Sequence, residues 1–497
     1  MNCEVNHRRC NHPRTRQNWM PTRLLDVSST KTTAGTVTLV EDTNISPGLE
    51  YMTLSHCWGL KTIISLTQAN MESLKGGISV FKLPRSFQDA IIVAGWFRCQ
   101  YLWIDSLCII QDSEEDWRKE SAAMRHVYKN ARLNIAATGA ANSSFGLFVD
   151  RNPSLISTAL VSVSWDGKLP KGNFHFYLRR IWEQGINRAP LNRRGWVFQE
   201  RYLSRRNLHF GSESIFFECH ELEACETFPA GLPIILDAHL INRFKAVDLP
   251  SDQLPTAGAT SMLESWKKIV VPFMDCDFTY PSDKVVAFSG VAEEFGSKSN
   301  DIYLAGLWKN CFFIEQLLWY VNVKTQANGQ PCARPSMYRA PSWSWLSIDG
   351  RINFDLTFQP SLIEILEANV ILADNNNPTG EVRHGVLSIC ALLKYANLRA
   401  AADQGKTFEL HDEDNNRKGS VALKFDEVAI RPTQSFCLAV RFESNPRGHI
   451  LQGLLLAPTG GKTMEFNRVG YFETEDSKVH EWLIRSKNAG KTKLTIV

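Results

Sequence analysis

Residues 101–105 read YLWID, a run of aromatic and aliphatic residues that ends on an aspartate. A short apolar run bounded by polar residues is typical of a buried strand. Residues 51–55, YMTLS, predict another strand, and between the two we expect a helix from Leu83-Pro84 to about Phe97, because proline is tolerated in a first helical turn. Strand, helix and strand in this order are typical of the units of a parallel sheet.

A second helix and a third strand follow the aspartate. Asp112 or Ser113 is a suitable N-cap for a helix that runs to about Asn130, with three acidic residues in its first turn. Residues 131–137 then predict a third buried strand. The predicted fold class is α/β, with a mostly parallel sheet in the N-terminal domain. The expected organisation is an N-terminal arm (1–50), the α/β domain (51–230), a mainly helical region (231–350) and a β-rich C-terminal domain (351–497).

Composition excludes several classes of protein. The 497 residues carry 55 Lys and Arg against 52 Asp and Glu, a net charge of +3 that is too balanced for a nucleic-acid-binding protein. The N-terminus is polar, and every long apolar stretch is interrupted by charged or polar residues before it reaches the ~18 residues of a spanning helix. Twelve cysteines are spread along the chain without a dense framework. We therefore expect a cytoplasmic protein with reduced thiols, no transmembrane segment and no nucleic-acid partner.

Cys3, His7 and Cys10 offer three ligands of the kind that zinc accepts. Their spacing is not a paired zinc motif, and no fourth ligand is evident in the sequence. The expectation is therefore an N-terminal arm without a metal, in which these three residues are the weak candidates.

A thiol, an imidazole and a carboxylate occur near the ends of the first two predicted strands. His56 and Cys57 follow the first strand, while Asp105 and Cys108 lie at and just past the end of the second. Ligands bind beyond the carboxyl ends of strands in open α/β sheets, so a thiol-dependent acyl-transfer site is one hypothesis. Both cysteines lie in apolar surroundings, where a buried, inert thiol is the commoner outcome.

Trp196 and Glu200 are four residues apart, so on a helix they share a face. A glutamate in a partly apolar cleft can stabilise the positive charge that develops on a ribosyl ring when a glycosidic bond breaks. The alternative is a surface glutamate that pairs with neighbouring arginines, and spacing alone favours this alternative.

Three blocks of the chain resemble the signature of fungal heterokaryon incompatibility (HET) domains. They are Ser55-His56-Cys57-Trp58-Gly59, residues 102–131 with their LWIDSLCIIQD start, and residues 194–211 with their RGWVFQER start. Together they cover about residues 51–220. The resemblance implies a role in nonself recognition, in which HET domains induce cell death after unlike hyphae fuse.

HET domains are also remotely similar to Toll/interleukin-1 receptor (TIR) domains, which have a flavodoxin-like fold and in many cases cleave NAD at the nicotinamide–ribose bond. Trp196 to Glu200 keeps the spacing of the Trp-Cys-x-x-Glu segment of TIR domains, with Val197 in place of the cysteine. This resemblance implies a flavodoxin-like sheet and a catalytic role for Glu200. The candidate substrate-binding residues are Ser55, His56, Trp58, Trp103, Asp105, Arg194 and Trp196, the tryptophans to stack a ring and His56 or the arginines to contact phosphates.

The preferred function is thus a cytosolic cell-death effector that uses NAD as its substrate and requires no cofactor. A protein partner or self-assembly is expected, because TIR-like catalysis commonly depends on assembly. The rival hypotheses are a non-enzymatic assembly module and the acyl-transfer enzyme that would use Cys57 or Cys108 with His56.

Overall fold

The computed structural model describes two compact units, Met1–Val247 and Asp248–Val497. Described are all residues except 1, 12–18, 32–34, 42–48, 60–62, 153, 155, 157, 165–171, 178–179, 234–254, 300, 311, 323–328, 356–359, 402–406, 428–431, 446–447 and 486–489.

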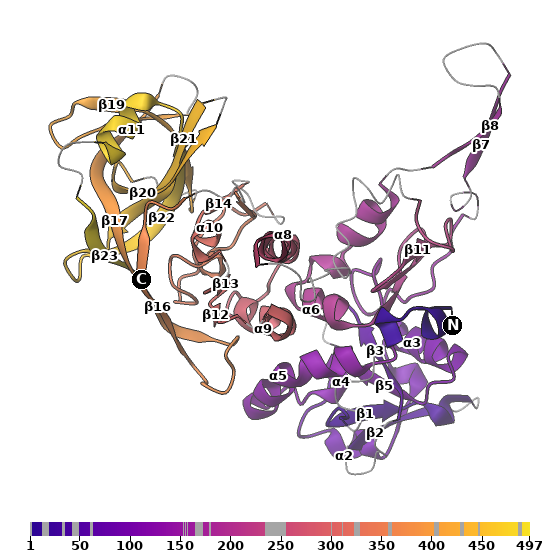
Figure 1. Cartoon of the computed structure of the whole chain (residues 1–497). Helices are drawn as coiled ribbons and strands as arrows, with labels where there is room; N and C mark the ends of the chain where they lie inside the picture. The colour runs from indigo at the N-terminus through magenta and orange to yellow at the C-terminus, as the bar shows by residue number, and fades with distance from the viewer. Residues whose placement is uncertain are drawn as a thin grey trace. The chain divides into compact units, whose positions relative to one another are not determined.

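A mixed sheet of nine strands forms the centre of the first unit (Figure 1). The strands are β1 (Arg23–Asp26), β2 (Thr36–Glu41), β3 (Tyr51–Ser55), β4 (Ile78–Ser79), β5 (Tyr101–Ile104), β6 (Leu133–Ala136), β9 (Arg206–Phe210), β10 (Ile215–Cys219) and β11 (Glu223–Cys225). Their order across the sheet is β11-β10-β9-β6-β3-β5-β1-β2-β4. The four neighbours β9, β6, β3 and β5 run parallel.

The predicted α/β class is confirmed, but the sheet is mixed where the sequence predicted a mostly parallel one. Every pairing outside the four central strands is antiparallel. Connections of only a few residues, such as those between β9, β10 and β11, can join only antiparallel neighbours, whereas parallel strands need a long crossover. The segment expected as an arm, residues 1–50, supplies β1 and β2 to this sheet.

Helices in the crossovers lie where the sequence predicted them. The described α-helices of this unit are α1 (Asn2–Asn6), α2 (Met71–Lys75), α3 (Arg85–Trp96), α4 (Asp105–Cys108), α5 (Glu114–Asn130) and α6 (Gly195–Leu203). Strands β7 (Ala159–Val163) and β8 (Gly172–Phe176) pair as an antiparallel hairpin. Pro84 precedes the first turn of α3. Ser113 caps α5, because its hydroxyl accepts a hydrogen bond of 3.2 Å from the backbone N–H of Asp116.

Different helices pack on the two faces of the central sheet. Thr53 of β3 lies opposite Trp103 of β5 and Asn134 of β6, so these three side chains share one face. Helices α5 and α6 pack against each other on this face, and α3 contacts β3 and β5 from the other side (Figure 1). Polar residues on this shared face, such as Thr53 and Asn134, lie beside the candidate site.

The second unit confirms the predicted β-rich C-terminal region. Its helices are α8 (Pro255–Phe273), α9 (Asp283–Ser299), α10 (Phe313–Leu317) and α11 (Ser477–Ile484), and its short strands are β12 (Tyr303–Leu304), β13 (Leu307–Trp308), β14 (Trp319–Val321) and β15 (Ile352–Phe354). A larger sheet contains β16 (Glu364–Leu372), β17 (Val382–Ala400), β18 (Phe408–His411), β19 (Arg417–Phe425), β20 (Gln434–Asn445), β21 (Gly448–Pro458), β22 (Glu465–Thr474) and β23 (Thr492–Ile496). Strand β20 pairs with both β21 and β17, so this sheet closes on itself.

Candidate functional site

Glu200 is the acidic residue around which the candidate site is built. It lies on α6, where only 5% of it is exposed, and its carboxylate accepts a hydrogen bond of 2.5 Å from the hydroxyl of Ser55. Ser55 is the last residue of β3, so the bond joins α6 to the carboxyl end of a central parallel strand. The alternative of an exposed glutamate paired with surface arginines is therefore wrong, because this face of α6 is turned toward the sheet.

The surroundings of Glu200 change its acidity. Burial, followed by the negative charge of Asp105, raises the pKa of the Glu200 carboxyl from 4.5 to about 7, while Ser55, Arg194 and the Tyr128 hydroxyl act in the opposite direction. Near neutral pH the carboxyl is therefore divided between its protonated and its ionised form. A carboxyl with this acidity can exchange a proton, or carry a charge, at physiological pH.

Asp105 and Trp58 form the part of the site that reaches solvent. Asp105 begins α4 directly after β5, and the backbone N–H of Ser106 donates to its Oδ1 at 2.7 Å. The indole N–H of Trp58 donates to Asp105 Oδ2 at 2.9 Å. The Asp105 side chain is 21% exposed, and Trp58 and Arg194 are half-buried. Incoming molecules would therefore meet these three side chains before Glu200.

His56 lies beneath this outer layer. It is 3% exposed, its Nδ1 is 3.5 Å from Asp105 Oδ1, and its ring contacts Phe87 edge-to-face. Burial lowers the pKa of His56 to about 4, against the opposing charge of Asp105. The imidazole is thus neutral at pH 7, so a contact of His56 with phosphate would be a hydrogen bond without a positive charge. Arg194 donates a hydrogen bond to the backbone carbonyl of His56 and is itself half-buried.

A buried polar network continues from Ser55 across the sheet. Asn134 donates to Ser55 at 3.0 Å and to Asn207 of β9 at 3.0 Å. Asn207 donates in turn to the carboxylate of Glu218 on β10 at 3.3 Å. Arg201, the neighbour of Glu200 on α6, pairs with both oxygens of Glu218 at 2.8 and 2.9 Å. Since buried polar groups require partners, this network fixes the orientation of α6 relative to β3.

The structure brings five of the seven predicted substrate-binding residues together with Glu200, namely Ser55, His56, Trp58, Asp105 and Arg194. The other two are tryptophans. Trp103 is fully buried and contacts Tyr128 edge-to-face at 5.6 Å, so it is a core residue that offers no face to an incoming ring. Trp196 is half-buried and packs edge-to-face with Trp117 of α5 at 6.1 Å.

Sequence reasoning missed Tyr128 and the asparagines of the network. Tyr128 lies within the helix predicted to run to about Asn130, and no role in the site was predicted for it, yet its hydroxyl influences Glu200. Asn134 lies inside a strand that is otherwise apolar, and its amide is completely buried. An amide in the middle of a buried strand requires hydrogen-bond partners, so Asn134 was the sign in the sequence of a buried polar network.

The two candidate thiols do not have the properties of nucleophiles. Burial raises the pKa of Cys57, and it raises the pKa of Cys108 to about 12. Both thiols are therefore protonated near neutral pH, whereas the thiolate is the reactive form. The geometry favours Glu200 over thiol chemistry.

The N-terminal metal candidates lie in another part of the first unit. Cys3, His7 and Cys10 come together with a fourth residue, Cys219 of β10, that the sequence did not point to. A cavity of about 300 Å³ adjoins Cys3 and is lined mainly by apolar side chains, including those of Leu133 and Leu208. These two residues alternate with Asn134 and Asn207 along their strands, so the cavity is on the sheet face opposite to Glu200.

The fold and site define an α/β domain with a buried acid at the carboxyl end of its parallel strands. Residues 51–200 match the family model described as Heterokaryon incompatibility protein (HET), so the chain carries a HET domain, as its signature blocks predict. The matched region runs from the first residue of β3 to Glu200 and suggests a role in heterokaryon incompatibility. Neither the curated proteins nor the solved structures gave a match. Among the described helices, none combines the length and apolar character needed to cross a membrane.

Proposed function

We propose that this HET-domain protein is a fungal cell-death effector that cleaves NAD at the nicotinamide–ribose bond, with Glu200 as the catalytic carboxylate. The observation that carries the proposal is a buried carboxyl group, with a pKa of about 7, at the carboxyl end of a central parallel strand. Ionisable groups with strongly shifted pKa values cluster at functional sites, because catalysis needs them near the working pH.

The order of the parallel strands supports a TIR-like, flavodoxin-like arrangement. Counted along the chain, β3, β5, β6 and β9 are the first to fourth parallel strands, and their spatial order β5-β3-β6-β9 is therefore 2-1-3-4. Flavodoxin-like sheets have this order and bind their ligands where the first and third strands adjoin. Ser55 lies at that junction, since β3 pairs with β5 on one side and β6 on the other.

The proposed reaction breaks the bond between C1′ of the ribose and the nicotinamide nitrogen. The bonding electrons move to the pyridinium ring, which leaves as neutral nicotinamide, and positive charge develops on the ribose. The ionised Glu200 carboxylate stabilises this charge, and water adds to C1′ and loses a proton to give ADP-ribose. The Ser55 hydroxyl holds the carboxylate in place through its 2.5 Å hydrogen bond.

The outer residues then have binding roles. Arg194 supplies the cation for the diphosphate, and Trp58 supplies a half-exposed ring on which a base can stack. Asp105 orients Trp58 through their hydrogen bond and raises the pKa of Glu200. Since Glu200 is only 5% exposed, the site has to open before substrate reaches it. Self-assembly or a protein partner is the proposed trigger for this opening.

The test follows NAD and viability in cells that express the full chain, and nicotinamide release by the purified protein. Glu200→Gln keeps the size of the side chain and an oxygen that accepts from Ser55, but it removes the charge. We expect NAD to fall before viability does with the natural chain, and both to be preserved with Glu200→Gln. Cleavage by the purified protein should increase from pH 6 to pH 8, because only the ionised carboxylate stabilises the ribosyl cation.

Glu120→Gln is the matched control, since Glu120 is a buried glutamate on α5 that lies beside Arg23 rather than in the candidate site. It should cleave NAD like the natural chain. Death with NAD intact, equally rapid with Glu200→Gln, would refute the enzyme and favour the rival assembly module.

A further inference from the structure

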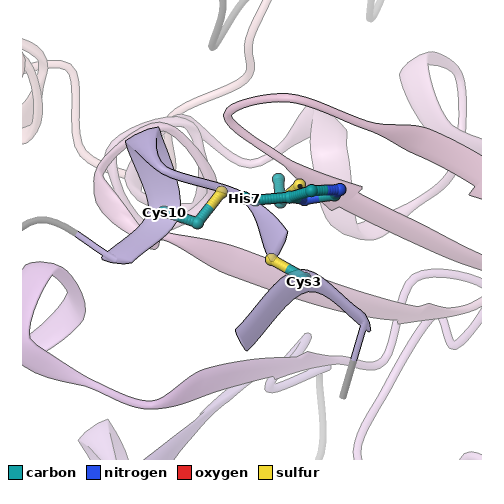
Figure 2. Close-up of side chains that lie close together, drawn as sticks. Cys3, His7 and Cys10 are labelled. Carbon is teal, nitrogen blue, oxygen red and sulfur yellow. Dashed lines mark hydrogen bonds between the residues drawn. The ribbon is translucent and has the colours of Figure 1, made fainter. Parts of the chain in front are cut away.

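Two cysteines and a histidine in the first eleven residues meet a third cysteine that lies more than two hundred residues later. Cys3 belongs to α1, His7 follows this helix, Cys10 lies in the next short turn, and Cys219 ends β10. Their ligand atoms, three sulfurs and one imidazole nitrogen, all lie within 4.8 Å of one another. Figure 2 shows the side chains of Cys3, His7 and Cys10 turned toward the same space.

The arrangement has the dimensions of a tetrahedral zinc site. With bonds of about 2.3 Å to sulfur and about 2.0 Å to nitrogen, a tetrahedral zinc ion holds two sulfurs about 3.8 Å apart and a sulfur and a nitrogen about 3.5 Å apart. The Cys219 sulfur is 3.3 Å from Nδ1 of His7, and all remaining separations are at most 4.8 Å. A small inward movement of the side chains would complete the tetrahedron. Three cysteines and one histidine are also a frequent ligand set of structural zinc.

Hydrogen-bond donors surround the sulfurs as they do in metal sites. The backbone N–H groups of Glu221 and Leu222 donate to the Cys219 sulfur at 3.5 and 3.2 Å. Arg206 Nε donates to the Cys3 sulfur at 3.1 Å. Three thiolates and one zinc ion carry a net charge of −1, which the Arg206 guanidinium offsets. Such outer donors orient metal ligands and stabilise their charged form.

We propose that Cys3, His7, Cys10 and Cys219 bind one zinc ion, and that the ion has a structural role. All four coordination positions would be filled by protein, which leaves none for water or substrate. The proposal is independent of the NAD-cleavage hypothesis, because the cluster shares no residue with the Glu200 site.

The ion would fasten the N-terminal segment to the end of the sheet that carries the buried polar network. α1 has only five residues, too few to be stable without tertiary contacts. Besides the cluster, the segment makes the Glu4–Arg132 ion pair at 2.7 Å, a hydrogen bond of 2.6 Å from the backbone N–H of Arg9 to Glu221, and hydrogen bonds from Arg206 to Cys10 and Asn11. Arg206 lies on β9, next to Asn207, and Cys219 lies on β10, next to Glu218. Metal binding and the order of this sheet edge would therefore be coupled.

The first experiment measures the metal content of the purified full chain by elemental mass spectrometry. We expect about one zinc per chain, and none in Cys10→Ser or Cys219→Ser. Cys225→Ala is the matched control, because Cys225 is a buried cysteine of the adjacent strand β11 outside the cluster, and it should keep its zinc. His7→Cys should also keep zinc, since it preserves four ligands.

A second measurement uses the natural chain alone and so does not depend on the folding of any variant. Alkylation of Cys3, Cys10 and Cys219 should begin only when a strong chelator is added, together with a loss of amide protection in residues 2–11. The proposal is overturned if the folded natural chain contains no zinc, if Cys219→Ser keeps the zinc, or if two of the three cysteines form a disulfide.

Discussion

Replacing Glu200 by glutamine should stabilise the first unit at high pH and leave its stability nearly unchanged at low pH. The pKa of this buried carboxyl is about 7, against 4.5 for an ordinary glutamate. Between these two values the folded state binds more protons than the unfolded state, so the free energy of unfolding falls as the pH rises. Each pH unit in this interval is worth about 1.4 kcal/mol, which gives a full cost of about 3 kcal/mol above pH 7. Well below pH 4.5 the carboxyl is protonated in both states and costs nothing.

Glutamine avoids this cost because it is never charged. Its side-chain oxygen still accepts the hydrogen bond from Ser55, so the comparison isolates the burial of the charge. The stability difference between Glu200→Gln and the natural chain should therefore grow from near zero at pH 4 to about 3 kcal/mol at pH 8. It should change most steeply between pH 5 and pH 7.

Native-state hydrogen exchange of the amides in β3 and β6 is the appropriate assay. It reports on the strands beside Glu200, whereas a global melt would mix the two units. Glu115→Gln, on the exposed side of α5, makes the same change of charge and serves as the control. A difference that stays constant from pH 4 to pH 8, or that is no larger than that of the control, would refute the assignment of a raised pKa to Glu200.

Three further variants test the surroundings of the site. Asp105→Asn should lower the pKa of Glu200, because the negative charge of Asp105 helps to raise it, and the stability profile described above should move to lower pH. Arg201→Met should destabilise the first unit by about 3–5 kcal/mol in the same hydrogen-exchange measurement, since it leaves the Glu218 carboxylate buried without its guanidinium, and adding Glu218→Leu should recover much of the loss. Gly139→Ala should lower the stability of the first unit by about 1–3 kcal/mol, because a Cβ there would lie 2.5 Å from a backbone nitrogen of the turn after β9. Unchanged exchange of the β9 amides would contradict that packing.

The local part of the fold was predictable because its signals are local. The apolar runs at 51–55 and 101–105, the proline before α3 and the Ser113 cap are determined by residues within a few positions of one another. The HET signature likewise lies in short blocks. The antiparallel strands β1 and β2 escaped prediction because β2 joins the sheet only through β1, and the pairing of β1 with β5 depends on contacts across more than seventy residues.

The candidate site was predictable in its residue types but not in its environment. Sequence spacing placed Glu200 on a helix, yet favoured an exposed side chain, because the spacing carries no information about which face of α6 meets the sheet. Only the tertiary structure decided that the Ser55 hydroxyl and the Asp105 charge adjoin this carboxyl, and burial together with that charge is what raises its pKa.

The cluster of Cys3, His7, Cys10 and Cys219 was likewise predictable only in part. The sequence alone offered three candidate ligands, Cys3, His7 and Cys10, within one short segment, but without a fourth it favoured an arm that binds no metal. The fourth, Cys219, became a neighbour only when β10 joined the sheet beside the N-terminal segment. Helices, strands and motifs follow from interactions between residues close in sequence, whereas a buried charge and a complete ligand set need residues that only folding brings together.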